Sequence, residues 1–180
     1  MAEKKRRPYR KEYLNDFYKN PAGEYVYTGA YYRQQGSEAE KNVCRRKLTV
    51  ETVGIVLAVV LAGCQNAAGM TGSPYVLIPY AAEAIAAFAT VWALIRMLCG
   101  GDPLRAYIYE KAVAKLPDRA MLLLIFAGAS AVGAIIYLIL HGFEGKIAGA
   151  LIYLAMKAAQ MILAYDVRHT VRATEWKIDA

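Results

Sequence analysis

The chain has few of the side chains on which enzymes most often rely. Its 180 residues include two histidines and three cysteines, and no C-x-x-C or H-E-x-x-H sequence occurs. No glycine-rich phosphate loop follows a strand-like segment. Cys44, Cys64 and Cys99 lack the spacing of a disulfide framework or a metal site. We therefore expect a protein that is not an enzyme and that binds no cofactor and no metal.

Charged residues are also scarce in four long stretches, residues 48–70, 74–98, 119–141 and 146–166. Each is close to the ~20 residues that an α-helix needs to cross a ~30 Å hydrocarbon core. Hydrophobic residues make up 57% of the chain, against ~45–50% in soluble proteins. The predicted fold class is all-α: a polytopic membrane protein with a compact antiparallel bundle of four transmembrane helices over residues 48–166, surrounded by the lipid bilayer.

The net charge of +7 is concentrated between alternate spans. Residues 1–47 carry twelve Lys and Arg, residues 99–119 carry four, and residues 66–73 carry none. Short basic loops remain on the cytoplasmic side of a membrane. We therefore predict a multi-pass protein of the plasma membrane whose two termini and central loop, residues 99–118, are cytoplasmic. Because this rule accounts for the basic charge, we expect no nucleic-acid binding.

The cytoplasmic arm, residues 1–47, contains seven of the fourteen tyrosines between Tyr9 and Tyr32. A short helical face is predicted around Phe17 and Tyr18, β-forming residues follow at 24–28, and residues 34–41 are expected to lack regular structure. Since disordered segments are poor in aromatic residues, we interpret the arm as a docking element for a protein partner or for lipid headgroups. The alternative is an orientation signal without fixed structure. The docking candidates are Tyr25, Tyr27, Tyr31 and Tyr32.

The central loop carries residues typical of the start and the end of a short helix. Asp102 and Pro103 fit a helix N-cap followed by proline at the first helical position, and Pro117 is expected to end the segment. This pattern predicts a helix over residues 103–116. Residues 167–180 are expected to form a cytoplasmic tail.

Each span carries small and polar residues at steps of three and four, which place them on one face. Because lipid solvates apolar side chains, membrane helices associate through such faces. We predict a bundle in which short outer linkers keep the first two and the last two helices adjacent. The residues on these faces are Glu51, Gly54, Ala58, Ala62 and Gln65; Tyr80, Glu83, Ala87 and Thr90; Ser130, Gly133, Tyr137 and His141; and Gly149, Tyr153, Lys157, Gln160 and Ala164.

Glu83 and Lys157 are the exceptional members of these faces. At 1.5 Å per residue they lie about 14 and about 16 Å from the outer ends of their spans. A lone charge at this depth costs ~2.5–3.5 kcal/mol, and an opposite charge at the same level offsets part of that cost. We predict that the two side chains face each other across the bundle, with Tyr80, Tyr153 and Gln160 on the same faces.

Two functions fit these features. The leading hypothesis is a non-enzymatic membrane subunit or scaffold that presents its arm to a membrane or cytoplasmic protein partner, with the ion pair fixing helix register. The alternative is a small transporter or channel, a homo-oligomer because four helices are few for a solute path, with Glu83, Lys157 and Gln160 along the path. A sealed, dry pair favours the first function, and a pair reached by a water-filled cavity favours the second.

Overall fold

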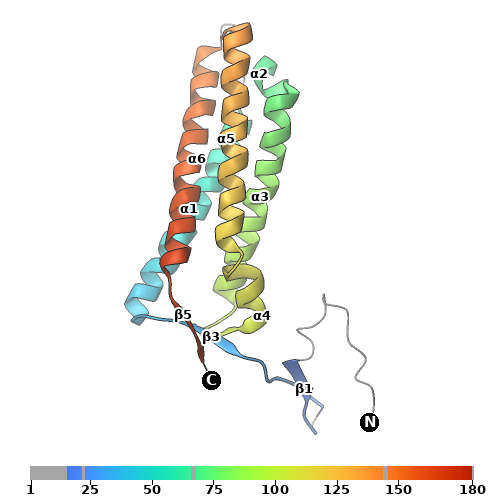
Figure 1. Ribbon diagram of the computed structural model, residues 1–180, viewed down its shortest axis with the longest axis vertical. Helices are drawn as coiled ribbons and strands as arrows, with labels where there is room; N and C mark the ends of the chain where they lie inside the picture. The colour runs from blue at the N-terminus through green and yellow to red at the C-terminus, as the bar shows by residue number, and fades with distance from the viewer. Residues whose placement is uncertain (1–15, 22, 66–67, 144–145, 180) are drawn as a thin grey trace.

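Four long helices run up and down beside one another in an elongated bundle (Figure 1). The computed structural model describes residues 16–21, 23–65, 68–143 and 146–179. The helices are α1 (Glu38–Gly63), α3 (Pro74–Cys99), α5 (Leu116–His141) and α6 (Ile147–Ala173). A short helix, α2 (Ala68–Gly72), lies between α1 and α3 at one end of the bundle, which we call the loop end. The opposite end is the sheet end, because short β-strands gather there.

Three helical segments are long and apolar enough to cross a membrane: Pro74–Cys99, Ala106–His141 and Ile147–Ala173. The chain is therefore mostly helical, as predicted, and a membrane location is plausible for it. The helix at the first predicted span, residues 48–70, is not among these three segments, and its bounds differ from the prediction. It begins at Glu38 and ends at Gly63, and the rest of the range includes the separate helix α2.

The early start of α1 has a local cause. The Ser37 hydroxyl accepts a hydrogen bond from the Glu40 backbone N–H, and the Glu40 carboxylate accepts one from the Ser37 N–H at 2.8 Å. This reciprocal capping box satisfies two of the free N–H groups at a helix start. The prediction that residues 34–41 lack regular structure is therefore wrong for residues 38–41, and also for Gln34, which ends a strand, whereas residues 35–37 are irregular. The first turns of α1 are charged.

The sheet end is built from segments that are distant in sequence. Strand β3 (Tyr31–Gln34) pairs antiparallel with β4 (Leu104–Arg105) on one side and with β5 (Trp176–Asp179) on the other. The fourth long helix continues past residue 166 to Ala173 before β5 begins, so the expected tail is mostly ordered. The sheet thus ties the arm, the central loop and the C-terminal segment together.

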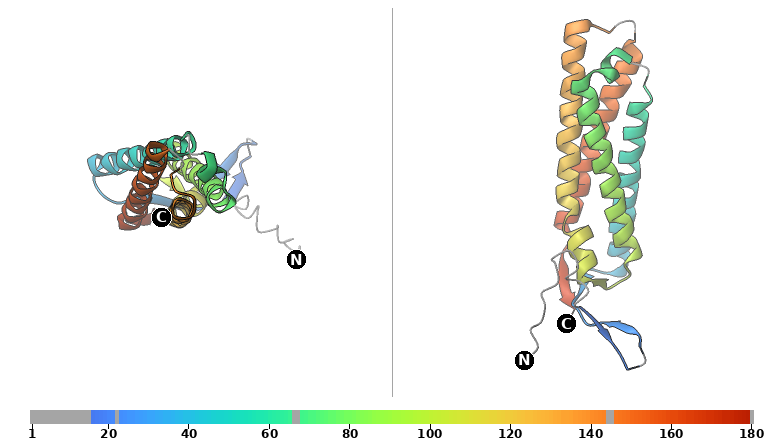
Figure 2. Two further views of the ribbon diagram at one scale, coloured as in Figure 1. Left: turned by 90° about the horizontal axis from the view of Figure 1, so that it is seen from above. Right: turned by 90° about the vertical axis from the view of Figure 1, so that its right-hand side faces the viewer.

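A two-stranded hairpin, separate from this sheet, projects from the sheet end away from the helices (Figure 2). It consists of β1 (Phe17–Lys19) and β2 (Tyr25–Tyr27), which pair antiparallel with Tyr18 opposite Val26. The prediction of a helical face around Phe17 and Tyr18 is wrong, because both residues lie in β1. The turn around residues 20–24 is closed by backbone and side-chain hydrogen bonds between Asn20 and Glu24.

The central loop forms a helix later than predicted. Its helical part is α4 (Ala106–Ile108) followed by the π-helical turn η2 (Tyr109–Val113), rather than residues 103–116. Asp102 does not cap it, because its carboxylate binds Lys41 and Arg45 of α1, each at 3.3 Å. Pro117 lies in the first turn of α5, where its missing N–H costs no hydrogen bond.

The bundle is packed through small residues. Helix α3 packs mainly on α5, and α6 packs on both α1 and α5, while α1 and α3 touch over a smaller area. The last two helices are therefore close neighbours, as predicted, and the first two are less so. At Gly133 a Cβ atom would lie 2.5 Å from the Tyr75 carbonyl oxygen, so only glycine allows α5 to approach α3 this closely.

Polar and apolar side chains are distributed opposite to those of a soluble bundle. Glu51, Glu83, Thr90, Ser130, Lys157 and Gln160 are buried. The outward faces carry large apolar side chains, among them Leu57, Ile78, Ile85, Phe88, Ile125, Ile139 and Ile162. An exposed apolar surface of this extent marks contact with lipid or with another protein.

Candidate functional site

The centre of the bundle holds a fully buried ion pair. The Lys157 Nζ atom lies 2.6 Å from Oε1 and 2.8 Å from Oε2 of Glu83, and neither residue has any exposed surface. Both α3 and α6 run from the loop end to the sheet end, which is why residues at similar depths meet. The predicted pairing is therefore confirmed. Without its partner, either charge would be buried uncompensated at a cost of several kcal/mol.

Two tyrosine rings flank the ammonium group. The Lys157 Nζ atom lies 4.6 Å from the ring centroid of Tyr80 and 4.9 Å from that of Tyr153. These tyrosines lie one turn nearer the loop end, on the same helices as Glu83 and Lys157 respectively. Each ring adds a cation–π attraction, which is strongest when the cation is desolvated. The ammonium group is thus held by one carboxylate and two ring faces.

The hydroxyl groups of these tyrosines connect the pair to the remaining two helices. The Tyr80 hydroxyl donates to the Val59 carbonyl of α1 at 3.1 Å. The Tyr153 hydroxyl of α6 and the Ser130 hydroxyl of α5 are hydrogen-bonded to each other. Ser130 also donates to the Val76 carbonyl of α3. All four helices therefore contribute to one connected polar cluster, which fixes their relative depth.

Gln160 is not part of this cluster. It is fully buried one turn nearer the sheet end, and neither its amide nitrogen nor its amide oxygen has a hydrogen-bond partner. A buried polar group without a partner costs ~1–3 kcal/mol. The structure thus brings together four of the five residues predicted at the pair and leaves Gln160 outside it.

A cavity of about 210 Å³ approaches the pair from the loop end but stops short of it. Its lining residues are Gly63, Thr71, Val76, Leu77, Tyr80 and Tyr153. Neither Glu83 nor Lys157 lines this cavity, because the two tyrosine rings lie between them and it. The ion pair is therefore sealed within the described structure.

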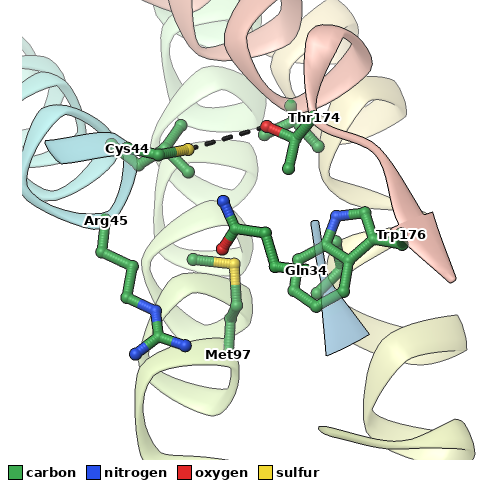
Figure 3. Close-up of a pocket in the computed structure, with 9 residues that line it drawn as sticks. Gln34, Cys44, Arg45, Met97, Thr174 and Trp176 are labelled. Carbon is green, nitrogen blue, oxygen red and sulfur yellow. Dashed lines mark hydrogen bonds between the residues drawn. The ribbon is translucent and has the colours of Figure 1, made fainter. Parts of the chain in front are cut away.

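A second, much smaller cavity lies between the bundle and the sheet. Figure 3 shows Gln34 of β3 between Met97 and Trp176, with Cys44 and Thr174 3.6 Å apart at the upper edge. Its volume of about 10 Å³ corresponds to about one water molecule. This cavity is a packing junction between α1, the end of α6 and the sheet rather than a ligand site.

The four candidate docking tyrosines have different surroundings. Tyr25 is 73% exposed on the hairpin, whereas Tyr27 is buried and its hydroxyl accepts a hydrogen bond from the Ala106 N–H. Tyr31 packs edge-on against Tyr27, and Tyr32 stacks on Tyr109 with ring centroids 4.0 Å apart. Only Tyr25 is freely accessible. The other three attach the arm to the bundle.

Sequence reasoning missed two exposed residues of the hairpin. Tyr18 is 58% exposed and Val26 is 46% exposed, and they are direct cross-strand partners on one face. The alternation of Phe17, Tyr18 and Lys19 is a strand pattern that could have separated the two faces. The opposite face carries Phe17 and Tyr27, which pack against the Arg105 guanidinium.

Buried charge fastens the sheet end to α1. Lys41 is 5% exposed and its ammonium group lies 2.8 Å from Glu38 and 3.3 Å from Asp102. The hydrogen bond to Glu38, followed by that to Asp102, raises the pKa of Lys41 above its ordinary value. The pKa of Tyr27 is also raised, chiefly because burial disfavours the charged phenolate. Because both pKa values are raised, Lys41 stays charged and Tyr27 stays neutral near neutral pH, and the contacts at this junction do not depend on titration there.

No metal site accompanies these features within the described residues, since no three His, Cys, Asp or Glu side chains there are grouped to hold an ion. Comparison with protein-family models, curated proteins and solved structures finds no match to this chain. Functional inference therefore depends on the geometry alone.

Proposed function

We propose that the chain is a four-span membrane protein that anchors a docking hairpin at the cytoplasmic face of the membrane. The apolar part of α1, residues 48–63, would be the fourth span, about 24 Å long at 1.5 Å per residue. Its outward face supports this assignment because it is apolar throughout. The exposed residues there are Val50, Val53, Leu57, Val60 and Leu61.

The charges support a single orientation. Basic residues flank the helices at the sheet end, including Arg45, Arg96, Lys115 and Arg172. Under the positive-inside rule this end would be cytoplasmic, with α2 and the loop end on the outer side. Both ends of the chain would then be cytoplasmic.

The observation that carries the proposal is the projecting hairpin. Tyr18, Tyr25 and Val26 expose large apolar side chains on an element that stands away from the bundle. Only β1 and β2 pair with each other in this sheet among the described residues, so both outer strand edges are open to an added strand. Such edges and aromatic side chains are typical of surfaces that bind an extended segment.

The charge of the arm indicates the kind of partner. Residues 1–47 contain twelve Lys and Arg and six Asp and Glu, a net charge of +6 out of +7 for the chain. A partner with an extended acidic segment would complement this arm and associate faster at low ionic strength. The proposed partner is therefore an acidic cytoplasmic protein segment.

The sealed ion pair fits an anchoring role. An ion-conducting or transport path requires water or substrate to reach the charged groups, whereas Glu83 and Lys157 have no exposed surface. In the proposed function the pair fixes helix register. The transporter alternative stays a prediction, and it requires that Glu83→Gln change the flux through reconstituted protein.

Affinity purification of the full-length chain from membranes tests the proposal. The hairpin variant Tyr18→Ser/Val26→Ser should lose a partner that wild-type protein recovers. The matched control is Ile178→Ser, which changes a comparably exposed residue of β5, in the three-stranded sheet. Deletion of residues 1–41 would be a poor test, because it also removes β3 and the start of α1.

Two results would contradict the proposal. One is recovery of no specific partner by the wild-type chain, and the other is equal recovery by wild type and the hairpin variant. Loss of the partner in both the hairpin variant and the Ile178→Ser control would move the docking surface to the three-stranded sheet.

A further inference from the structure

The loop-end cavity has the size and walls of a ligand site. Its volume of about 210 Å³ far exceeds the ~10–15 Å³ that a cavity needs to hold one water molecule, so it has room for several small groups. A methylene group occupies nearly the same volume as a water molecule, so a short length of hydrocarbon chain fits. The walls come from α1, α2, α3 and α6, which makes the cavity a feature of the assembled bundle.

The lining leaves little for a polar ligand to bind. The hydroxyl of Tyr80 is engaged by the Val59 carbonyl, and that of Tyr153 by Ser130. Among the described residues, no buried polar side-chain atom without a partner belongs to a lining residue. The larger part of the accessible lining surface is apolar, which favours an apolar ligand.

Two lining residues of the cavity, Gly63 and Leu77, are exposed, so the cavity reaches the outer face of the bundle beside them. That face is apolar, because the nearby residues Leu61 and Ile78 are 48% and 69% exposed. In the proposed membrane orientation this face meets hydrocarbon. The molecule present at the mouth is then a membrane lipid.

We propose that the cavity binds one acyl chain of a membrane lipid from the outer leaflet, an inference that rests on the proposed membrane insertion. The chain enters between α1 and α3, which are the least closely packed pair of neighbouring long helices. Its end contacts the rings of Tyr80 and Tyr153. Because these rings hold the Lys157 ammonium group, the lipid completes the packing around the ion pair.

Gly63 controls access to the site. A Cβ atom at this position would overlap the Tyr80 hydroxyl group. A leucine there would project into the cavity and exclude the chain. Ile78 and Ile85 are exposed on the outer face of α3 and lie outside the cavity lining, and we call them belt residues. Contact between lipid and these residues is unaffected by this change.

Photolabelling of the wild-type protein tests the inference. The full chain is reconstituted in phosphatidylcholine vesicles that contain a small fraction of phosphatidylcholine with a diazirine in one acyl chain. After irradiation, adducts are mapped by mass spectrometry. We expect adducts on the belt residues Ile78 and Ile85 and also on Tyr80 and Tyr153, although Tyr153 is only 1% exposed.

The outcomes separate this inference from the membrane proposal. Adducts on belt residues without adducts on either tyrosine would overturn the acyl-chain site while supporting insertion. Absence of adducts on Ile78 and Ile85 would overturn membrane insertion itself. In Gly63→Leu the tyrosine adducts should fall to background while belt adducts persist. A second variant, Leu77→Trp, which covers the mouth, should give the same result if Gly63→Leu does not fold.

A water-soluble diazirine supplies the opposite control. If it labels Tyr80 and Tyr153 in wild-type vesicles and the lipid probe does not, the cavity is aqueous and the inference is wrong.

Discussion

The Glu83–Lys157 pair should show strong energetic coupling in a double-mutant cycle. Removing one partner of a buried pair costs ~3–5 kcal/mol, so Glu83→Gln and Lys157→Met should together sum to ~6–10 kcal/mol. The double variant leaves only a neutral buried amide, which costs ~1–3 kcal/mol. The coupling free energy is therefore about 3 kcal/mol or more. Both oxygens of Glu83 contact Lys157 at 2.6 and 2.8 Å, which supports a value at the strong end.

The assay is equilibrium unfolding of the full chain in lipid–detergent bicelles, with the unfolding free energy measured for all four proteins. A matched control cycle uses Thr90→Ala and Ser130→Ala. Both residues are fully buried, but Thr90 bonds to Ala86 and Ser130 to Val76 and Tyr153. The control cycle should be additive. Additivity within ~0.5 kcal/mol for Glu83 and Lys157 as well would refute the reasoning, since interacting residues depart from additivity.

Three further predictions concern stability. Gly133→Ala should lower the unfolding free energy of the protein by ~1–3 kcal/mol, because the added Cβ would meet the backbone of α3. The control is Gly128→Ala, where the nearest atom to an added Cβ is Met161 Sδ at 3.8 Å. In the same unfolding assay this variant should gain up to ~1 kcal/mol from the higher helix propensity of alanine. Gln160→Leu should raise the unfolding free energy by ~1 kcal/mol or more, because it removes two unpartnered buried atoms; a loss would indicate a partner for the amide. The Ser37 N–H lowers the pKa of Glu40 from 4.5, so wild type should lose more stability than Glu40→Gln as the pH falls from about 5 to about 3. Equal loss in both proteins would remove that hydrogen bond as the cause.

The ion pair could be predicted because it depends on depth along a helix, and the position of a residue in the sequence gives that depth directly. Glu83 and Lys157 lie at similar distances from the same end of two parallel helices, and a rise of 1.5 Å per residue converts that into proximity. The surrounding rings followed from the same faces. The exclusion of Gln160 could not be predicted, because it depends on side-chain direction at a single turn.

The sheet end was largely beyond local sequence patterns. Strands β3 and β5 pair although almost the whole chain separates them in sequence, and neither segment has a residue pattern that predicts which strand it pairs with. The start of α1 was different, because Ser37 and Glu40 have the spacing of a capping box and could have predicted it. Likewise, composition alone made Tyr25 and Tyr27 equivalent. Both lie on the same face of β2, but Tyr27 is covered by Arg105 and bonded to the Ala106 N–H, whereas Tyr25 lies beyond this cover and is exposed.

The central claim is that the projecting hairpin is the docking surface of a membrane-anchored protein. Its most direct test is the dissociation constant of the purified partner for the full chain in lipid nanodiscs. In Tyr18→Ser/Val26→Ser the binding free energy should fall by ~1.4 kcal/mol or more, which raises the dissociation constant at least ~10-fold. Binding by Ile178→Ser should equal that of wild type. An unchanged dissociation constant in the hairpin variant would contradict the account.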